Sequence, residues 1–349
     1  MKVPLHPIRC LLSLGLLFAA CHPDPPDAEP AFYHWKSELR QDSAQTAYLQ
    51  ELDARRIYIR LFDLDWNERL RSPAPIAEVQ LGDFPYTSFE WVPTIFITNR
   101  SLKQLPIQET SSLARRIVDK IERMRQAADM PAIREVQLDC DWTESTRKVY
   151  FRLLKECRRQ LSQNGVQLSV TVRLHQLRYP EQTGVPPADR GMLMYYNMGE
   201  VRSWEEDNSI LNLEAAAPYL QAGQYPLPLD LALPLFRWGV VFREGKMIRL
   251  INDLSPEDLQ DRSRFFPMTG KRYEVVKGTF LQGHYLYQGD WIRLENVTAD
   301  NLKGAVDQLM RLKWPAPFHL AFYHLNSTAV NNYPPALLKT LEKQLETRP

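Results

Sequence analysis

The sequence predicts an α/β protein, a (β/α)8 TIM barrel with a small antiparallel β insertion late in the chain. Two observations predict this fold: eight apolar segments of strand length, and helical patterns between several of them. Strands that alternate with helices form parallel sheets, and eight such units over ~300 residues fit a closed barrel better than an open sheet. A doubly wound sheet is the alternative, but no glycine-rich loop follows the first strand.

The expected strands are rich in β-branched, aromatic and aliphatic residues. In chain order they span residues 32–37, 56–66, 94–99, 134–142, 167–177, 191–198, 230–242 and 318–326. Apolar side chains at helical spacing predict helices over 109–128, 145–164 and 300–312, and Gly165 follows the second of these as its expected C-cap. Short segments punctuated by glycines, between about 270 and 297, predict the β insertion, which should shape the active-site face.

The first 20 residues have the pattern of a secretory signal, in which basic residues precede an apolar run that ends in small residues. The LFAAC sequence that ends at Cys21 resembles a bacterial lipobox, which implies lipidation of Cys21. Residues 21–30, rich in proline, would then form a tether and residues 31–349 the barrel. We therefore expect an exported protein, lipid-anchored to a membrane of the bacterial cell envelope. An ordinary signal peptide with a chance cysteine is the alternative.

Composition and spacing exclude several classes of function. The net charge is +1 and no basic run is present, so we expect no nucleic-acid partner. Besides Cys21, the expected mature chain has only Cys140 and Cys157, which would be either two buried thiols or one disulfide. No H-x-x-x-H or C-x-x-C spacing occurs, and no G-x-S-x-G motif, so we expect no metal, no cofactor and no serine nucleophile.

A pair of aspartates at the end of the fourth strand is the best candidate for a reactive centre. Gln137, Asp139 and Asp141 share one face of this strand, because alternate side chains of a strand point the same way. Two adjacent carboxylates on a largely buried strand are costly unless they are paired or used in chemistry. The alternative is that both merely accept hydrogen bonds at a strand end.

Active sites of such barrels lie at the carboxyl ends of the strands, where this sequence places acids, aromatics and amides. Sugar rings stack on aromatic planes and their hydroxyls bind polar side chains, so this set predicts a carbohydrate (glycan) ligand. Each residue alone is more often a packing residue, and only the whole set predicts a glycan ligand. The expected substrate-binding residues are Trp35, Asp63, Asp65, Trp142, Arg173, His175, Tyr196, Asn197, Trp238, Tyr323 and His324.

Three of these segments carry a resemblance to a known family. The sequence LDCDW at 138–142 resembles the fourth-strand signature D-G-x-D-x-D-W-E of glycoside hydrolase family 18, the chitinase-like TIM barrels. MYYN at 194–197 resembles that family's sixth-strand M-x-Y-D, and LSVTV at 168–172 resembles its fifth strand. The pattern is also similar to a family of exported bacterial proteins with a D-x-D-W-T motif.

The sequence departs from the family's pattern at the acid. The signature aligns its last two aspartates with Asp139 and Asp141, but Thr143 stands where the family has its catalytic glutamate, and Asn197 replaces the sixth-strand aspartate. Glu144 follows one residue late and would point elsewhere unless the strand bulges. The candidate catalytic residues are therefore Asp139, Asp141 and Glu144.

Three functions remain open. The first is a glycoside hydrolase with rearranged acids, in which a second carboxylate must lie within ~5–10 Å of Asp141. The second is a carbohydrate-binding pseudoenzyme that keeps the aromatic cleft without the acid. The third is a structural or interaction lipoprotein of the cell envelope that uses the barrel only to present its loops.

Overall fold

The computed structural model describes residues 28–82, 84–221, 224–315 and 317–346. Eight parallel strands form a closed barrel, since β1 pairs with both β18 and β3. Around the barrel the strands are β1 (Ala28–His34), β3 (Arg56–Asn67), β6 (Glu90–Ile97), β7 (Glu135–Asp139), β8 (Gln167–Val172), β9 (Arg190–Met194), β10 (Leu229–Pro234) and β18 (Phe318–Tyr323). The predicted α/β barrel is confirmed.

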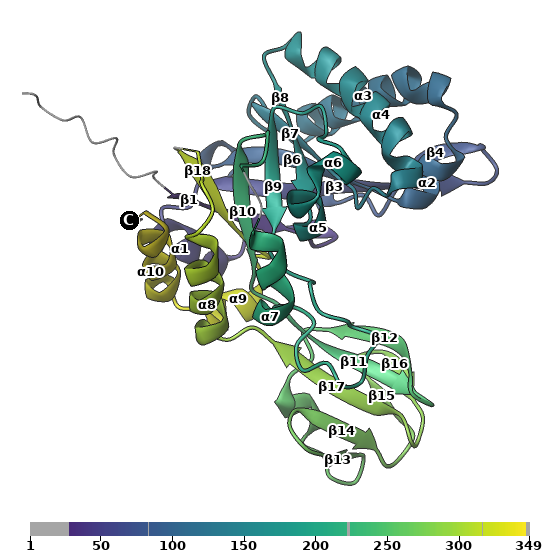
Figure 1. Ribbon diagram of the computed structural model, residues 1–349, viewed down its shortest axis with the longest axis vertical. Helices are drawn as coiled ribbons and strands as arrows, with labels where there is room; N and C mark the ends of the chain where they lie inside the picture. The colour runs from purple at the N-terminus through teal and green to yellow at the C-terminus, as the bar shows by residue number, and fades with distance from the viewer. Residues whose placement is uncertain (1–27, 83, 222–223, 316, 347–349) are drawn as a thin grey trace, which may run out of the picture.

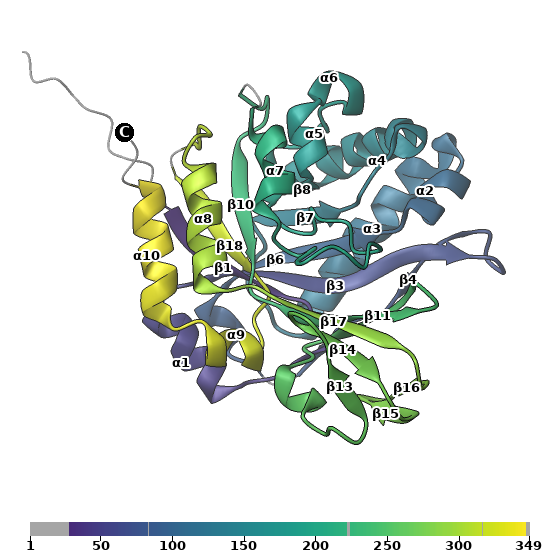
Figure 2. The ribbon, with the colours of Figure 1, turned by 60° about the horizontal axis from the view of Figure 1, so that its bottom comes forward.

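Helices cover the outside of the barrel (Figures 1 and 2). They are α1 (Ser43–Glu51), α2 (Asn99–Gln104), α3 (Thr110–Ala127), α4 (Glu144–Ser162), α5 (Leu174–Arg178), α6 (Pro180–Thr183), α7 (Leu213–Ala216), α8 (Ala299–Leu309), α9 (Ser327–Asn332) and α10 (Pro335–Glu346). The helices predicted from apolar spacing correspond to α3, α4 and α8, and each buries that apolar face. Gly165 follows α4 with φ +69°, a conformation that glycine adopts without a steric penalty.

A second, antiparallel sheet projects from the barrel (Figure 1). Its strands, in spatial order, are β12 (Lys246–Asn252), β11 (Arg237–Arg243), β17 (Trp291–Asn296), β14 (Arg272–Val275) and β13 (Phe265–Pro267). The hairpin β15 (Thr279–Leu281) and β16 (His284–Leu286) belongs to the same segment. This inserted sheet has its own buried cluster, to which Val241, Phe265 and Ile292 contribute. It follows the carboxyl end of β10, so it lies beside the barrel mouth.

The inserted sheet begins earlier than expected. We predicted one strand over 230–242 and an insertion from about 270, but β10 ends at Pro234 and β11 already belongs to the second sheet. The sequence could not separate the two strands, since both are apolar and buried. At the other end of the chain, residues 28–30 of the expected tether belong to β1.

Short strands lie outside the eight-stranded barrel. β4 (Ser72–Ile76) pairs with β3 in antiparallel fashion, and β2 (Glu38–Leu39) pairs with β5 (Gln80–Leu81) in a separate two-stranded sheet.

Cys140 and Cys157 are two buried free thiols, and burial raises the pKa of both. The predicted signal (1–20) and Cys21 lie outside the described residues. Within the described ranges, no helix has both the length and the apolar character needed to cross a bilayer.

Candidate functional site

A cavity of about 610 Å³ opens at the carboxyl ends of the barrel strands, and we call it the mouth cavity. Ten of the predicted site residues line it together: Trp35, Asp63, Asp139, Asp141, Arg173, Tyr196, Asn197, Trp238, Tyr323 and His324. Sequence reasoning did not single out five further lining residues: Arg60, Phe96, Phe236, Asn252 and Asp253. The inserted sheet supplies Trp238, Asn252 and Asp253, so both sheets build this cavity.

One wall of the mouth cavity is a continuous cluster of aromatic rings. The ring of Tyr323 lies 5.3 Å from that of Tyr196 in a stacked arrangement, and 5.5 Å from that of Trp35. Phe236 links Tyr323, at 5.8 Å, to Trp238, at 5.2 Å. Because each ring is fixed by its neighbours, the wall is preformed in the absence of a ligand.

Asp139 lies at the floor of the mouth cavity, where it ends β7. Its side chain is buried inside the barrel and accepts a hydrogen bond of 2.8 Å from the Thr171 hydroxyl on β8. Burial raises the pKa of this carboxyl from its ordinary value of 3.8 to about 6, since the interior disfavours its charged form. Arg173 opposes this effect, whereas the nearby charges of Asp141 and Asp63 add to it.

Asp141 is held by an arginine. Arg173 Nε donates to Asp141 Oδ1 at 2.5 Å and Arg173 Nη2 donates to Oδ2 at 3.1 Å, so the pair is bidentate. The guanidinium of Arg173 also lies 5.7 Å from the ring centre of Tyr196, which links the ion pair to the aromatic wall. Asp141 therefore reaches the cavity as one half of an ion pair.

Asp63 is neutralised in the same way by Arg60. Two hydrogen bonds, of 2.6 and 2.7 Å, join the guanidinium to both carboxylate oxygens. The two residues are three positions apart on β3, which would place them on opposite faces of a regular strand. The pairing of β3 with β6 shifts register between Arg60 and Phe62. This bulge adds one residue to β3, so that the side chains of Arg60 and Asp63 both reach the cavity. This irregularity left no recognisable trace in the sequence.

The rim near β18 carries His324 and Asp253. Burial lowers the pKa of His324 to about 4, so the ring is neutral at physiological pH. Asn326 Nδ2 lies 3.4 Å from His324 Nε2 and within 3.4 Å of both Asp253 carboxylate oxygens, so it connects the barrel to the turn after β12. His324 Nδ1 has no hydrogen-bond partner among the described residues.

Four of the predicted site residues do not line the mouth cavity. Trp142 is buried behind it, with its ring 5.5 Å from that of Tyr150 and its indole N–H bonded to the Thr183 carbonyl. Glu144 is exposed at the first position of α4. His175 is exposed on α5, because β8 ends at Val172 rather than continuing. Asp65 is held by the guanidinium of Arg100 and the hydroxyl of Thr98.

Thr143, at the position of the family's acid, caps a helix. Its side chain and that of Thr146 form a reciprocal capping box at the start of α4. Asn99 fixes the same loop, because it donates to the Asp141 carbonyl at 2.5 Å and accepts from the Thr146 hydroxyl at 2.8 Å. The loop that follows Asp139 is thus held at both ends. Within the described residues, no group of three or more His, Cys, Asp or Glu side chains is placed to hold a metal ion.

Comparison with known proteins supports the fold. No protein-family model and no curated protein sequence matches the chain. Among solved structures, a chitinase from Chromobacterium violaceum ATCC 12472 is similar, with a TM-score of 0.55 and 10% identity over 92% of this chain and 100% of that one. The chain has the fold of the chitinase-like barrels.

Two further structures agree. A spore cortex-lytic enzyme from Bacillus megaterium QM B1551 has a TM-score of 0.55 and 11% identity, over 94% of this chain and 76% of that one. A group IV chitinase from Ostrinia furnacalis has a TM-score of 0.50 and 11% identity, over 91% and 100% of the two chains. At these identities the similarity concerns the chitinase-like barrel and leaves the activity open.

Proposed function

We propose that this protein binds a glycan in the mouth cavity and does not hydrolyse it. The observation that carries this proposal is the state of the cavity's carboxylates. The aromatic wall is intact, but Asp63 and Asp141 are each held by an arginine and Thr143 is used to cap α4.

The mouth cavity suits a sugar. Its volume of about 610 Å³ is within the range of small-ligand sites, and it combines an aromatic wall with a few polar groups. Trp35 and Tyr323 line the cavity with aromatic rings, the kind of surface on which pyranoses stack. The amides of Asn197 and Asn252 can form hydrogen bonds with hydroxyls. So can the Nη1 groups of Arg60 and Arg173, which bond to none of the residues that the structure describes.

Hydrolysis needs more than binding. Cleavage of a glycosidic bond normally uses one carboxylic acid to protonate the leaving oxygen and a second group to stabilise or attack the anomeric centre. The acid must reach the leaving oxygen with a carboxyl oxygen that is free to donate. In Asp63 and Asp141 both carboxylate oxygens already accept hydrogen bonds from an arginine, and Glu144 lies outside the cavity, so none of the three is placed to be the acid.

One observation favours a second candidate, a glycoside hydrolase with Asp139 as its acid. A buried carboxyl with a pKa of about 6 keeps part of its population protonated near neutral pH, as a general acid requires. Asp141 would then act as the electrostatic stabiliser. This candidate predicts product release that disappears in Asp139→Asn.

Glycan binding and turnover can be measured on the same samples. Chitin oligomers and peptidoglycan fragments are titrated against the wild-type protein, Trp35→Ala and the control variant Tyr285→Ala, whose exposed ring lies on the β15–β16 hairpin. Our proposal predicts saturable binding that Trp35→Ala weakens and Tyr285→Ala preserves, with every glycan recovered intact. Shortened products would support the hydrolase, and the lack of binding to any glycan would favour an interaction lipoprotein instead.

We further propose that the protein is exported and lipid-anchored through Cys21, on the strength of the lipobox-like sequence alone. Mass spectrometry of the protein from its membrane fraction tests this directly. The proposal predicts an N-terminal peptide that begins at a lipid-modified Cys21, and a soluble exported protein when Cys21→Ser is expressed. An unmodified N-terminus after cleavage elsewhere would contradict it.

A further inference from the structure

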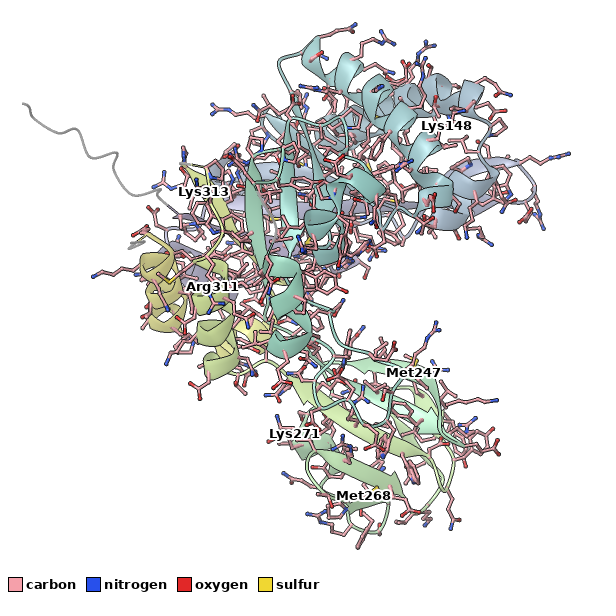
Figure 3. The ribbon with its side chains drawn as sticks, in the orientation of Figure 1. Lys148, Met247, Met268, Lys271, Arg311 and Lys313 are labelled. Atoms are coloured by element: carbon pink, nitrogen blue, oxygen red, sulfur yellow. The ribbon has the colours of Figure 1, made fainter. Side chains whose placement is uncertain are left out.

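A second cavity, of about 380 Å³, lies where the inserted sheet meets α8 and α9, and we call it the junction cavity. Its wall includes Arg237, Lys271, Tyr273, Glu295, Asn332 and Tyr333. Figure 3 shows Lys271 on the margin of the inserted sheet. Arg237 lines both this cavity and the mouth cavity, so the two cavities are neighbours that share one guanidinium.

The cations of the junction cavity have no counter-ion among the described residues. Arg237 Nε donates to the backbone carbonyl of Asp253 at 3.2 Å, and the Lys271 ammonium donates to the side-chain amide of Asn296. Both acceptors are neutral, and neither cation forms an ion pair with another residue that the structure describes. Glu257, whose pKa is lowered mainly by its own backbone and Ser255 and less by Arg237, does not line the cavity.

Glu295, the acid in the cavity wall, cannot neutralise these cations, because other donors already use its carboxylate. Arg293 donates to Glu295 Oε1 at 2.7 Å, while the Trp238 indole N–H and the Ser209 hydroxyl donate to Oε2 at 2.9 and 2.7 Å. The side chain of Glu295 is buried. The charge presented to the junction cavity is therefore positive.

We propose that the junction cavity binds the carboxylate of an acidic sugar whose glycan chain occupies the mouth cavity. This inference rests on the proposed glycan binding and specifies the class of glycan. Arg237 and Lys271 would form charge-assisted hydrogen bonds to the carboxylate, which are stronger than those between neutral groups. A neutral glycan would leave both cations unpaired, so the cavity selects for acidic chains.

The test uses two oligosaccharides that differ only in lactyl ether groups, each with one carboxylate, on alternate sugars. A tetrasaccharide of alternating N-acetylglucosamine and N-acetylmuramic acid carries lactyl carboxylates that the chitin tetramer lacks. Calorimetry gives the dissociation constants of both for the wild-type protein, Lys271→Gln and the control variant Lys277→Gln. The first substitution keeps a hydrogen-bond donor for Asn296 but removes the charge, while Lys277 is exposed on the same sheet segment and lines neither cavity.

We expect the wild-type protein to prefer the acidic tetrasaccharide by about tenfold, as one well-placed charged hydrogen bond provides. Lys271→Gln should reduce this preference about three- to tenfold and leave the affinity for the chitin tetramer unchanged, whereas Lys277→Gln should change neither. In the wild-type protein, rising salt concentration should reduce the preference as well.

The outcomes separate this inference from the proposed function. Equal binding of the two tetrasaccharides would overturn the acidic-sugar inference and leave glycan binding intact. Failure of both to bind would overturn glycan binding, and this inference with it. If Lys271→Gln and Lys277→Gln had the same effect on the preference for the acidic tetrasaccharide, the carboxylate would bind outside the junction cavity. Free lactate that bound as tightly as the acidic tetrasaccharide and displaced it would also overturn the inference, because the junction cavity would then be a site for small anions that does not recognise the sugar.

Discussion

Replacing Asp139 with asparagine is expected to stabilise the fold at neutral pH. Burial raises the pKa of this carboxyl from 3.8 to about 6, so the folded protein resists its ionisation. In the unfolded chain the group ionises near pH 4, and the folded state then bears a penalty that grows with pH up to about 6 and is constant above. The difference between the two pKa values corresponds to about 3 kcal/mol, since one pKa unit is worth about 1.4 kcal/mol.

Asparagine removes the penalty and keeps the contact. It is nearly isosteric with aspartate, and its side-chain oxygen can still accept the Thr171 hydroxyl. Asp139→Asn should therefore raise the free energy of unfolding by about 3 kcal/mol at pH 8 but by only about 0.5 kcal/mol at pH 4, where Asp139 is protonated in the folded protein and partly ionised in the unfolded chain. Urea unfolding followed by tryptophan fluorescence at both pH values measures the difference.

Asp230→Asn is the matched control, because this second buried aspartate inside the barrel has a pKa shift of opposite sign. Burial acts to raise the pKa of Asp230, but the hydrogen bond from His319 and the ion pair with Arg190 hold it below its ordinary value. Asp230→Asn should lower the free energy of unfolding at pH 8. The loss should be smaller in acid, because the wild-type carboxylate is then protonated and no longer gains from its ion pair. An Asp139→Asn variant that is no more stable than the wild type at pH 8 would refute the argument that this site bears a buried, unfavourable charge.

Three further predictions concern side chains around the site. Trp35→Ala should weaken glycan binding about tenfold through the loss of a stacking face, as calorimetry would show, with Tyr285→Ala as the unaffected control. Trp142→Phe should leave the affinity unchanged and cost about 1 kcal/mol of stability in urea unfolding, because its indole N–H bond is structural. Cys140 and Cys157 should react with a thiol reagent only after unfolding, so rapid reaction of either in the native protein would contradict their burial.

The sequence predicted the barrel well because its signals are local. Apolar segments and helical spacing repeat along the chain, and each barrel strand overlaps a segment recognised from composition. The same alternation predicted that Gln137 and Asp139 share one face of the strand, and β7 includes both residues. Residues at the strand ends then converge because the carboxyl ends of parallel strands meet at one rim.

Prediction failed where a strand ended sooner than its composition suggested. Trp142 turns towards α4 and His175 lies on α5, because β7 and β8 end at Asp139 and Val172 and the alternation of faces ends with them. Arg60 and Asp253 were not predicted as site residues for another reason. Arg60 reaches the cavity through a bulge in β3, and Asp253 reaches it because the inserted sheet lies against the barrel. Both features are set by tertiary packing.

Calorimetric titration of the wild-type protein with acidic and neutral oligosaccharides shows whether the mouth cavity binds a glycan without cleaving it. Binding gives heat that saturates at a fixed ratio of glycan to protein, whereas turnover gives heat that continues as long as substrate remains. We expect saturable heat with at least one oligosaccharide and no continuing signal. Sustained heat that Asp139→Asn abolishes would contradict it and establish a hydrolase.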